Sequence, residues 1–155
     1  MRRAWAGLAA LLMAAPALAT TVVPLDVGQL ARHSSAVVIG RVSDVQVQSD
    51  KPGVALTRAL VHVDQSLRGA LTGDVEVLSP GFAGAPTFAS GDELVLFITS
   101  RDGVNVLTGF AQGRFGILRD KNGNRVLDRA LPTHDRALAG SRSLDDLIRV
   151  VRAAN

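Results

Sequence analysis

The chain of 155 residues contains no cysteine and no tyrosine, and only 4% of its residues are aromatic. Without cysteine it can form no disulfide, no thiol nucleophile, no zinc knuckle and no iron–sulfur site. A hydrophobic core must therefore hold the fold together. The chain is long enough for this, because a domain of this size buries about two-thirds of the surface that its unfolded form exposes.

The N-terminal segment has the three parts of a secretory signal. A positive start, Met1-Arg2-Arg3, precedes an apolar run over residues 4–15, and small residues then occupy the positions that signal peptidase reads. We expect cleavage after Ala19, which makes residues 1–19 a signal peptide and residues 20–155 one exported domain, periplasmic or extracellular. The apolar run falls short of the roughly 20 residues that span a membrane. No membrane span is therefore expected after cleavage, and an uncleaved N-terminal anchor is the alternative.

The charge balance gives no sign of a nucleic-acid partner. The chain has 17 Lys and Arg against 14 Asp and Glu, and loss of Arg2 and Arg3 with the signal leaves 15 against 14. The net charge of the exported domain is then +1, and no dense basic run with interleaved aromatic residues remains. We therefore expect no nucleic-acid binding.

Most of the remaining chain has the patterns of β-strands. Over residues 36–48, Val38 and Val42 share one phase of a two-residue alternation, whereas Val45 and Val47 share the opposite phase. This flip predicts a β-bulge of the kind that bends strands in small barrels. Further strands are expected at about residues 56–67, 75–77, 93–99 and 104–107.

Turn and cap residues complete the expected architecture. Asn122-Gly123 favours a type I′ turn and predicts a hairpin over residues 115–128, with Leu118 opposite Leu127. Asp26 is the expected N-cap of a short helix over residues 27–34. The second helix is expected to begin with a capping box and to carry one apolar stripe; the residues are Ser143 and Asp146 for the box and Leu144, Leu147, Ile148 and Val151 for the stripe.

These elements predict a mainly β fold in one domain. We expect a small OB-like antiparallel β-barrel of five to seven strands, with a short N-terminal helix and a C-terminal amphipathic helix. The region from residue 80 to 91 contains two prolines, three glycines and two phenylalanines. We therefore interpret it as an irregular surface loop.

The order of motifs from residue 25 to 126 resembles a known module. The segments SAVVIGRV, LRG, VEVLSP and SGDELVLFI follow one another as in the OB-fold shared by tissue inhibitors of metalloproteinases and netrin C-terminal domains. A set of uncharacterised exported bacterial proteins is more similar still, because they share a later glycine-rich segment; its matching residues are Gly109, Gln112, Gly113 and Phe115. The resemblance implies an OB-like barrel, and implies less about function because one fold hosts many functions.

The resemblance also implies an inhibitor, with one departure. The eukaryotic inhibitors chelate the zinc of a protease through a mature N-terminal cysteine that disulfides hold in place. This chain is expected to begin at Thr20-Thr21 and has no cysteine. Inhibition would therefore need a different arrangement at the N-terminus.

No pattern in the sequence indicates catalysis, a cofactor or a metal site. The three histidines, His33, His62 and His134, lack metal-ligand spacing. Asp120, Asn122 and Asn124 have the spacing of the first calcium-loop ligands, but the glycine and glutamate expected later in such a loop are absent. No catalytic residue, cofactor or metal ligand is therefore assigned, although a catalytic triad assembles in space rather than in sequence.

Five residues are candidates for contact with a partner. Phe82 and Phe88 belong to the glycine- and proline-rich loop, where they either attach the loop to the barrel or present an aromatic surface to a protein or glycan outside the cytoplasm. Gln112 stands between two expected strands, beside a glycine suited to a bulge. Thr20 and Thr21 would form the new N-terminus and are the residues that an inhibitor would use.

Three functions remain open. The first is an exported, non-enzymatic binding module of unknown ligand. The second is inhibition of an exported metallopeptidase through the N-terminus and adjacent loops. The third is a hydrolase whose site is not visible in the sequence, for which His62 or His134 would meet a serine and an aspartate in a concave pocket.

Overall fold

The computed structural model describes residues 23–51, 54–82, 84–133 and 136–154. The expected signal peptide and the candidate residues Thr20 and Thr21 lie outside the described residues. In chain order the elements are α1 (Val27–His33), β1 (Ala36–Lys51), β2 (Val54–Arg68), β3 (Gly73–Pro80), β4 (Glu93–Arg101), β5 (Val104–Leu107), the 3-10 turn η1 (Phe110–Gly113), β6 (Arg114–Arg119), β7 (Arg125–Leu127) and α2 (Leu144–Ala153). The domain is mainly β, as expected.

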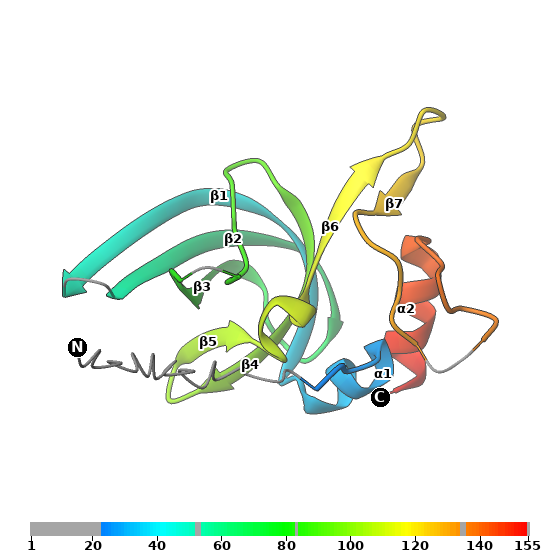
Figure 1. Ribbon diagram of the computed structural model, residues 1–155, viewed down its shortest axis with the longest axis horizontal. Helices are drawn as coiled ribbons and strands as arrows, with labels where there is room; N and C mark the ends of the chain where they lie inside the picture. The colour runs from blue at the N-terminus through cyan, green and yellow to red at the C-terminus, as the bar shows by residue number, and fades with distance from the viewer. Residues whose placement is uncertain (1–22, 52–53, 83, 134–135, 155) are drawn as a thin grey trace, which may run out of the picture.

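Five of the strands form a closed ring (Figure 1). Its order is β1-β2-β3-β5-β4, and β4 pairs back to β1 along six residue pairs. This barrel-like arrangement confirms the expected fold class. One pairing is parallel rather than antiparallel: β3 meets β5 at the single pair Leu78 and Val106. The reason is topological, since β5 returns from β4 in a tight turn and so runs in the same direction as β3.

The predicted bulge is present in β1 and decides which side chains enter the ring. The pairing of β1 with β2 changes register between Val42 and Asp44. Val38 and Val42 are buried inside the ring before this point, and Val45 packs against the same interior after it. The extra residue therefore reverses the phase of the alternation, which keeps valines pointing inward while the strand bends.

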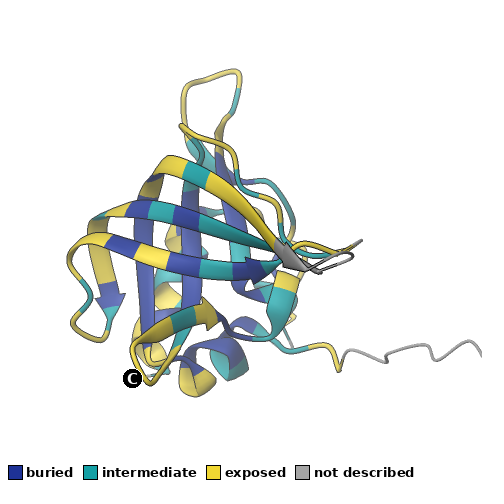
Figure 2. Ribbon diagram, turned by 90° about the vertical axis from the view of Figure 1, so that its left-hand side faces the viewer, coloured by how far each residue is buried: buried dark blue, intermediate teal, exposed yellow. Residues whose placement is uncertain are grey.

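The domain has two cores on opposite faces of the same strands. Figure 2 shows buried positions both on the strands and on the helices. Leu94, Leu96 and Ile98 of β4 point into the ring, whereas Val95 and Phe97 point outward against the helices. This explains why β4 is apolar at every position from Leu94 to Ile98. A strand that is buried on both faces cannot alternate.

The helices cover the outer face as amphipathic elements. The Asp26 side chain caps α1 by accepting a hydrogen bond from Gln29 N. The Gln29 side chain in turn accepts a hydrogen bond from Asp26 N, and the two bonds together form a capping box. In α2 only half of the predicted box forms: Ser143 accepts from Asp146 N, but the Asp146 carboxylate accepts from Ser141 Oγ instead. The apolar stripe of α2 faces the core as predicted.

The β6–β7 hairpin forms, but its register differs from the prediction by one residue. Leu118 lies opposite Val126, not Leu127. The turn has three loop residues instead of two, with Asp120 N donating to Asn124 O (2.9 Å) and Gly123 in the left-handed region at φ +83°. Asn122 does not have the positive φ that a type I′ turn requires. The Asp120 side chain selects this turn, because it accepts hydrogen bonds from the backbone N–H groups of Asn122 and Asn124.

Candidate functional site

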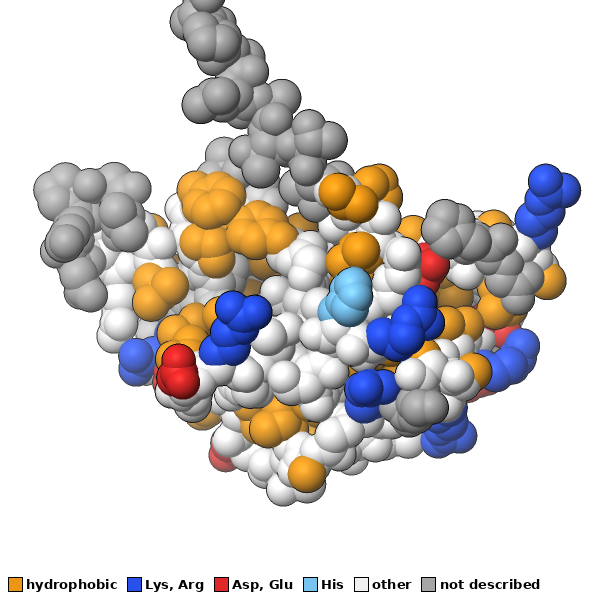
Figure 3. Space-filling view, turned by 90° about the horizontal axis from the view of Figure 1, so that it is seen from below, with side chains coloured by type: hydrophobic (Ala, Val, Ile, Leu, Met, Phe, Trp, Pro, Cys, Tyr) orange, Lys and Arg blue, Asp and Glu red, His pale blue; other side chains and the backbone are white. Residues whose placement is uncertain are grey.

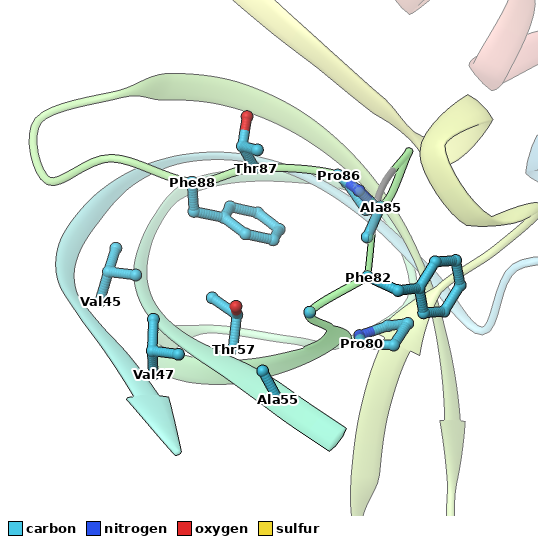
Figure 4. A pocket seen from close by; sticks show the side chains of 11 residues that line it. Val45, Val47, Ala55, Thr57, Pro80, Phe82, Ala85, Pro86, Thr87 and Phe88 are labelled. Carbon is cyan, nitrogen blue, oxygen red and sulfur yellow. The ribbon is translucent and has the colours of Figure 1, made fainter. Parts of the chain in front are cut away.

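An apolar cavity lies between the inner face of the β1–β2 hairpin and the connection from β3 to β4. Its volume is about 350 Å³. Figure 4 shows Val45 and Val47 of β1 on one side and Phe88 reaching in from the loop. The complete lining is Val45, Val47, Ala55, Thr57, Pro80, Gly81, Phe82, Ala85, Pro86, Thr87 and Phe88. No lining side chain is charged, so the cavity suits an uncharged apolar group.

The connection, which we call the 81–92 loop, is held to the barrel at both ends. Gly81 N donates to Ala55 O (2.7 Å), and Gly91 N donates to Val42 O (2.8 Å). A side chain at Gly81 would place its Cβ 2.6 Å from that of Ala55. The loop therefore follows the rim of the ring closely, and this close contact forms one wall of the cavity.

The two loop phenylalanines have different surroundings. Phe88 packs against the core inside the ring, with the Arg114 guanidinium 5.9 Å from its ring centroid. Phe82 is 59% exposed at the mouth of the cavity. Phe88 therefore attaches the loop to the barrel, and Phe82 is the aromatic side chain available to a partner.

Phe110 supports Phe82 from outside the loop. The two rings stack with centroids 5.3 Å apart and an angle of 17° between their planes. Phe110 has φ +62°, a left-handed conformation that is rare and strained for a bulky residue. No sequence pattern pointed to Phe110 as part of a site; the only signal was a phenylalanine directly after a glycine in a segment without strand alternation.

Gln112 holds the N-terminal segment beside η1. Its side-chain amide accepts a hydrogen bond from Leu25 N (2.7 Å) and donates one to Val23 O (3.1 Å). The predicted role of Gln112 in partner binding stays a prediction, but its described contacts are within the chain. Because Phe110 belongs to the same turn, Val23 emerges on the side of the molecule that carries the Phe82–Phe110 pair.

Three arginines near the end of the 81–92 loop, Arg114, Arg125 and Arg129, connect neighbouring strands through ion pairs and a cation–π contact. Arg114 forms ion pairs with Asp92 (3.2 Å) and Asp128 (3.4 Å), and Arg125 pairs with Glu93. The guanidinium of Arg129 lies 3.8 Å from the ring centroid of Phe115. Burial lowers the pKa of Arg129, and the nearby charge of Arg114 lowers it further against the opposing effect of Asp128. This group joins the end of the 81–92 loop to β6 and β7.

Of the two histidines considered for a hydrolase site, the described residues include only His62, which lies beside an aspartate. His62 Nδ1 lies 2.7 Å from Asp74 Oδ1, with both side chains more than half exposed. The strand partners of His62 are Arg41 and Asp74. His134, the alternative histidine, lies outside the described residues.

The residues with calcium-loop spacing, Asp120, Asn122 and Asn124, are joined by hydrogen bonds within the hairpin turn. The Asp120 carboxylate accepts from the backbone N–H of Asn122 and Asn124 and from the Asn124 side chain. These bonds, led by those from Asn124, lower the pKa of Asp120. Within the described ranges no three His, Asp or Glu residues are grouped to hold a metal ion.

The surface seen from below carries both hydrophobic and charged side chains (Figure 3). Hydrophobic side chains form several patches on this face, and its Lys and Arg side chains lie on both sides of the view, more of them towards the right. A nucleic-acid interface usually concentrates basic side chains in one stripe or patch. The expected absence of a nucleic-acid partner stays a prediction. None of the helices in the described part of the chain is long and apolar enough to cross a membrane.

Comparison with known proteins does not add a family to this description. No protein-family model matches the chain, and a search of curated proteins gives no match. The assignment of function therefore depends on the geometry of the cavity and of the aromatic pair beside it.

Proposed function

We propose that this protein is an exported, non-enzymatic binding module that accepts an uncharged apolar group in the cavity beneath the 81–92 loop. The observation that supports the proposal is the combination of a charge-free cavity with an exposed aromatic side chain at its mouth. Exposed aromatic residues next to a pocket are typical of the energetic centre of an interface. The stack on Phe110 fixes Phe82 in advance, which reduces the entropy lost on binding.

The lining favours an apolar side chain of a protein partner over a glycan. Among the lining side chains only Thr57 and Thr87 carry polar groups. A sugar presents many hydroxyl groups, and burying them without hydrogen bonds costs free energy. An aliphatic or aromatic side chain has no such requirement.

A fluorescence reporter can test this function directly. The only tryptophan, Trp5, lies in the expected signal peptide, so Phe82→Trp places the one indole of the exported protein at the cavity mouth. We expect N-acetylphenylalaninamide and N-acetylleucinamide to shift its emission in a saturable manner. The matched lysine and aspartate amides and N-acetylglucosamine should not do so.

The control for this test is a pair of charged substitutions at exposed valines. Val47 lines the cavity and Val104 of β5 does not. Val47→Asp should weaken binding of the apolar amides at least about tenfold, because it places a charge where the lining has none. Val104→Asp should leave binding unchanged. A response to all probes alike, or to none, would contradict the proposed function.

The second candidate function is inhibition of an exported zinc peptidase, and the Gln112 contacts favour it. Two hydrogen bonds from this side chain fix Val23 and Leu25 without a disulfide. Residues 20–22 would then be joined to a segment whose first described residues are fixed in place.

Inhibition can be separated from simple binding by shortening the N-terminus. Removal of Thr20 and Thr21 should abolish inhibition of a zinc endopeptidase, and Gln112→Ala should weaken it by releasing the segment. Binding of the apolar amides to the Phe82→Trp reporter should survive both changes. Retained inhibition after trimming would exclude this mechanism.

A further inference from the structure

In the described part of the chain, the second half of β1 has one edge that no strand pairs with. β1 pairs with β4 only from Ala36 to Arg41, although it pairs with β2 along its other side. The 81–92 loop covers this edge at Val42, where Gly91 N donates to the Val42 carbonyl. Beyond that point no described strand pairs with the edge over residues 44–48. An unpaired edge presents N–H and C=O groups to which another strand can bond.

The residues of this edge lack the usual side-chain protection against pairing, and the bulge between Val42 and Asp44 bends the strand just before them. Edge strands commonly carry lysine, proline or an inward-pointing charge. The segment from Asp44 to Gln48 reads DVQVQ and contains none of these. Its single carboxylate, on Asp44, lies on the exposed side and accepts a hydrogen bond from Gln46 Nε2 (3.0 Å). Val47 is 68% exposed on the side of the cavity, where an adjoining strand would cover it.

We propose that the partner of this edge is a second copy of the chain, paired antiparallel over residues 44–48 about a two-fold axis at Gln46. In this register Val45 of each copy lies opposite Val47 of the other. Asp44 lies opposite Gln48, so no two like charges meet. A shift by one residue would place each valine opposite a glutamine and mix the apolar and polar faces. The self-complementary pattern therefore favours a second copy as the occupant and disfavours a shift by one residue.

The pairing has a consequence for the cavity. Val45 and Val47 line it in each copy, and directly opposed residues of an antiparallel pair point to the same face. A two-fold axis at Gln46 thus places both cavities on one side of a continuous sheet. The dimer presents two neighbouring sites, and this inference stands whatever group the cavity binds.

The absence of cysteine allows a direct test of the register. Directly opposed residues have Cα atoms roughly 4.5–5.5 Å apart, within the range that a disulfide spans. Gln46→Cys should therefore cross-link into a covalent dimer under mild oxidation. Gln65→Cys, an exposed position of the same residue type on β2, is the matched control and should remain largely uncross-linked. Equal rates of cross-linking at the two positions would overturn the proposal.

Charge substitution at the axis provides an independent test. We expect the mass of the exported protein in sedimentation equilibrium to rise with concentration from one chain towards two. Gln46→Lys alone and Gln46→Glu alone should each remain monomeric, because the residue meets its own copy. A mixture of the two variants should recover the dimer. The proposal fails if the unaltered protein stays monomeric at every concentration, if either variant dimerises as well as the parent, or if the mixture stays monomeric.

Discussion

Replacing Gly113 with alanine is expected to destabilise the protein by about 3 kcal/mol, at the upper end of the cost of overpacking. A Cβ at this position would lie 2.3 Å from the carbonyl oxygen of Thr108 and 3.1 Å from that of Phe97. Both neighbours are backbone atoms of the sheet and its turn, so they cannot rotate away as a side chain can. The end of η1 would have to move outward.

The measurement is urea unfolding followed by far-UV circular dichroism, with Gly123→Asn as the control. Gly123 has φ +83°, a Cβ added there would meet no atom within 4 Å, and asparagine tolerates this backbone conformation. The control should change stability by less than about 1 kcal/mol. A loss at Gly113 no larger than at Gly123 would show that η1 does not lie against the sheet as described.

Replacing Phe115 with alanine is expected to cost about 4 kcal/mol, the typical loss for a large buried aromatic residue. Phe115 is fully buried and contacts Phe97, with ring centroids 6.0 Å apart. Its ring also supports the Arg129 guanidinium at 3.8 Å. The substitution therefore leaves a cavity in the outer core and also removes the cation–π contact of a partly buried charge.

Phe82→Ala is the matched control for Phe115, since both remove the same ring. Because Phe82 is 59% exposed, its loss should change the unfolding free energy by less than about 1 kcal/mol. Thermal denaturation of the two variants should give clearly different midpoints. Similar midpoints would mean that Phe82 is part of the core, and the proposed binding face would lose its exposed anchor.

The sequence predicted the parts of the fold that depend on side-chain periodicity. The phase flip between Val42 and Val45 indicated the bulge, and the strand pattern of residues 93–99 indicated β4. The Asp26 cap and the stripe of α2 were also correct. These patterns are local, so neighbouring residues are sufficient to reveal them.

The predictions from sequence were wrong or incomplete where the structure depends on hydrogen bonds of a polar side chain or on contacts between distant segments. The hairpin register depends on the Asp120 carboxylate, whose bonds to two backbone N–H groups favour a three-residue loop. The candidate site depends on Phe110 meeting Phe82 and on Val47 meeting the 81–92 loop. Such contacts join segments far apart in the chain, and no local pattern encodes them.

The sharing of β1 and β4 between two cores also bears on how the domain loses its structure. Alternate side chains of the same strand belong to the ring interior and to the layer beneath the helices. Loss of either core would therefore disturb the backbone that supports the other. We therefore expect the helices and the barrel-like ring to unfold in one cooperative transition.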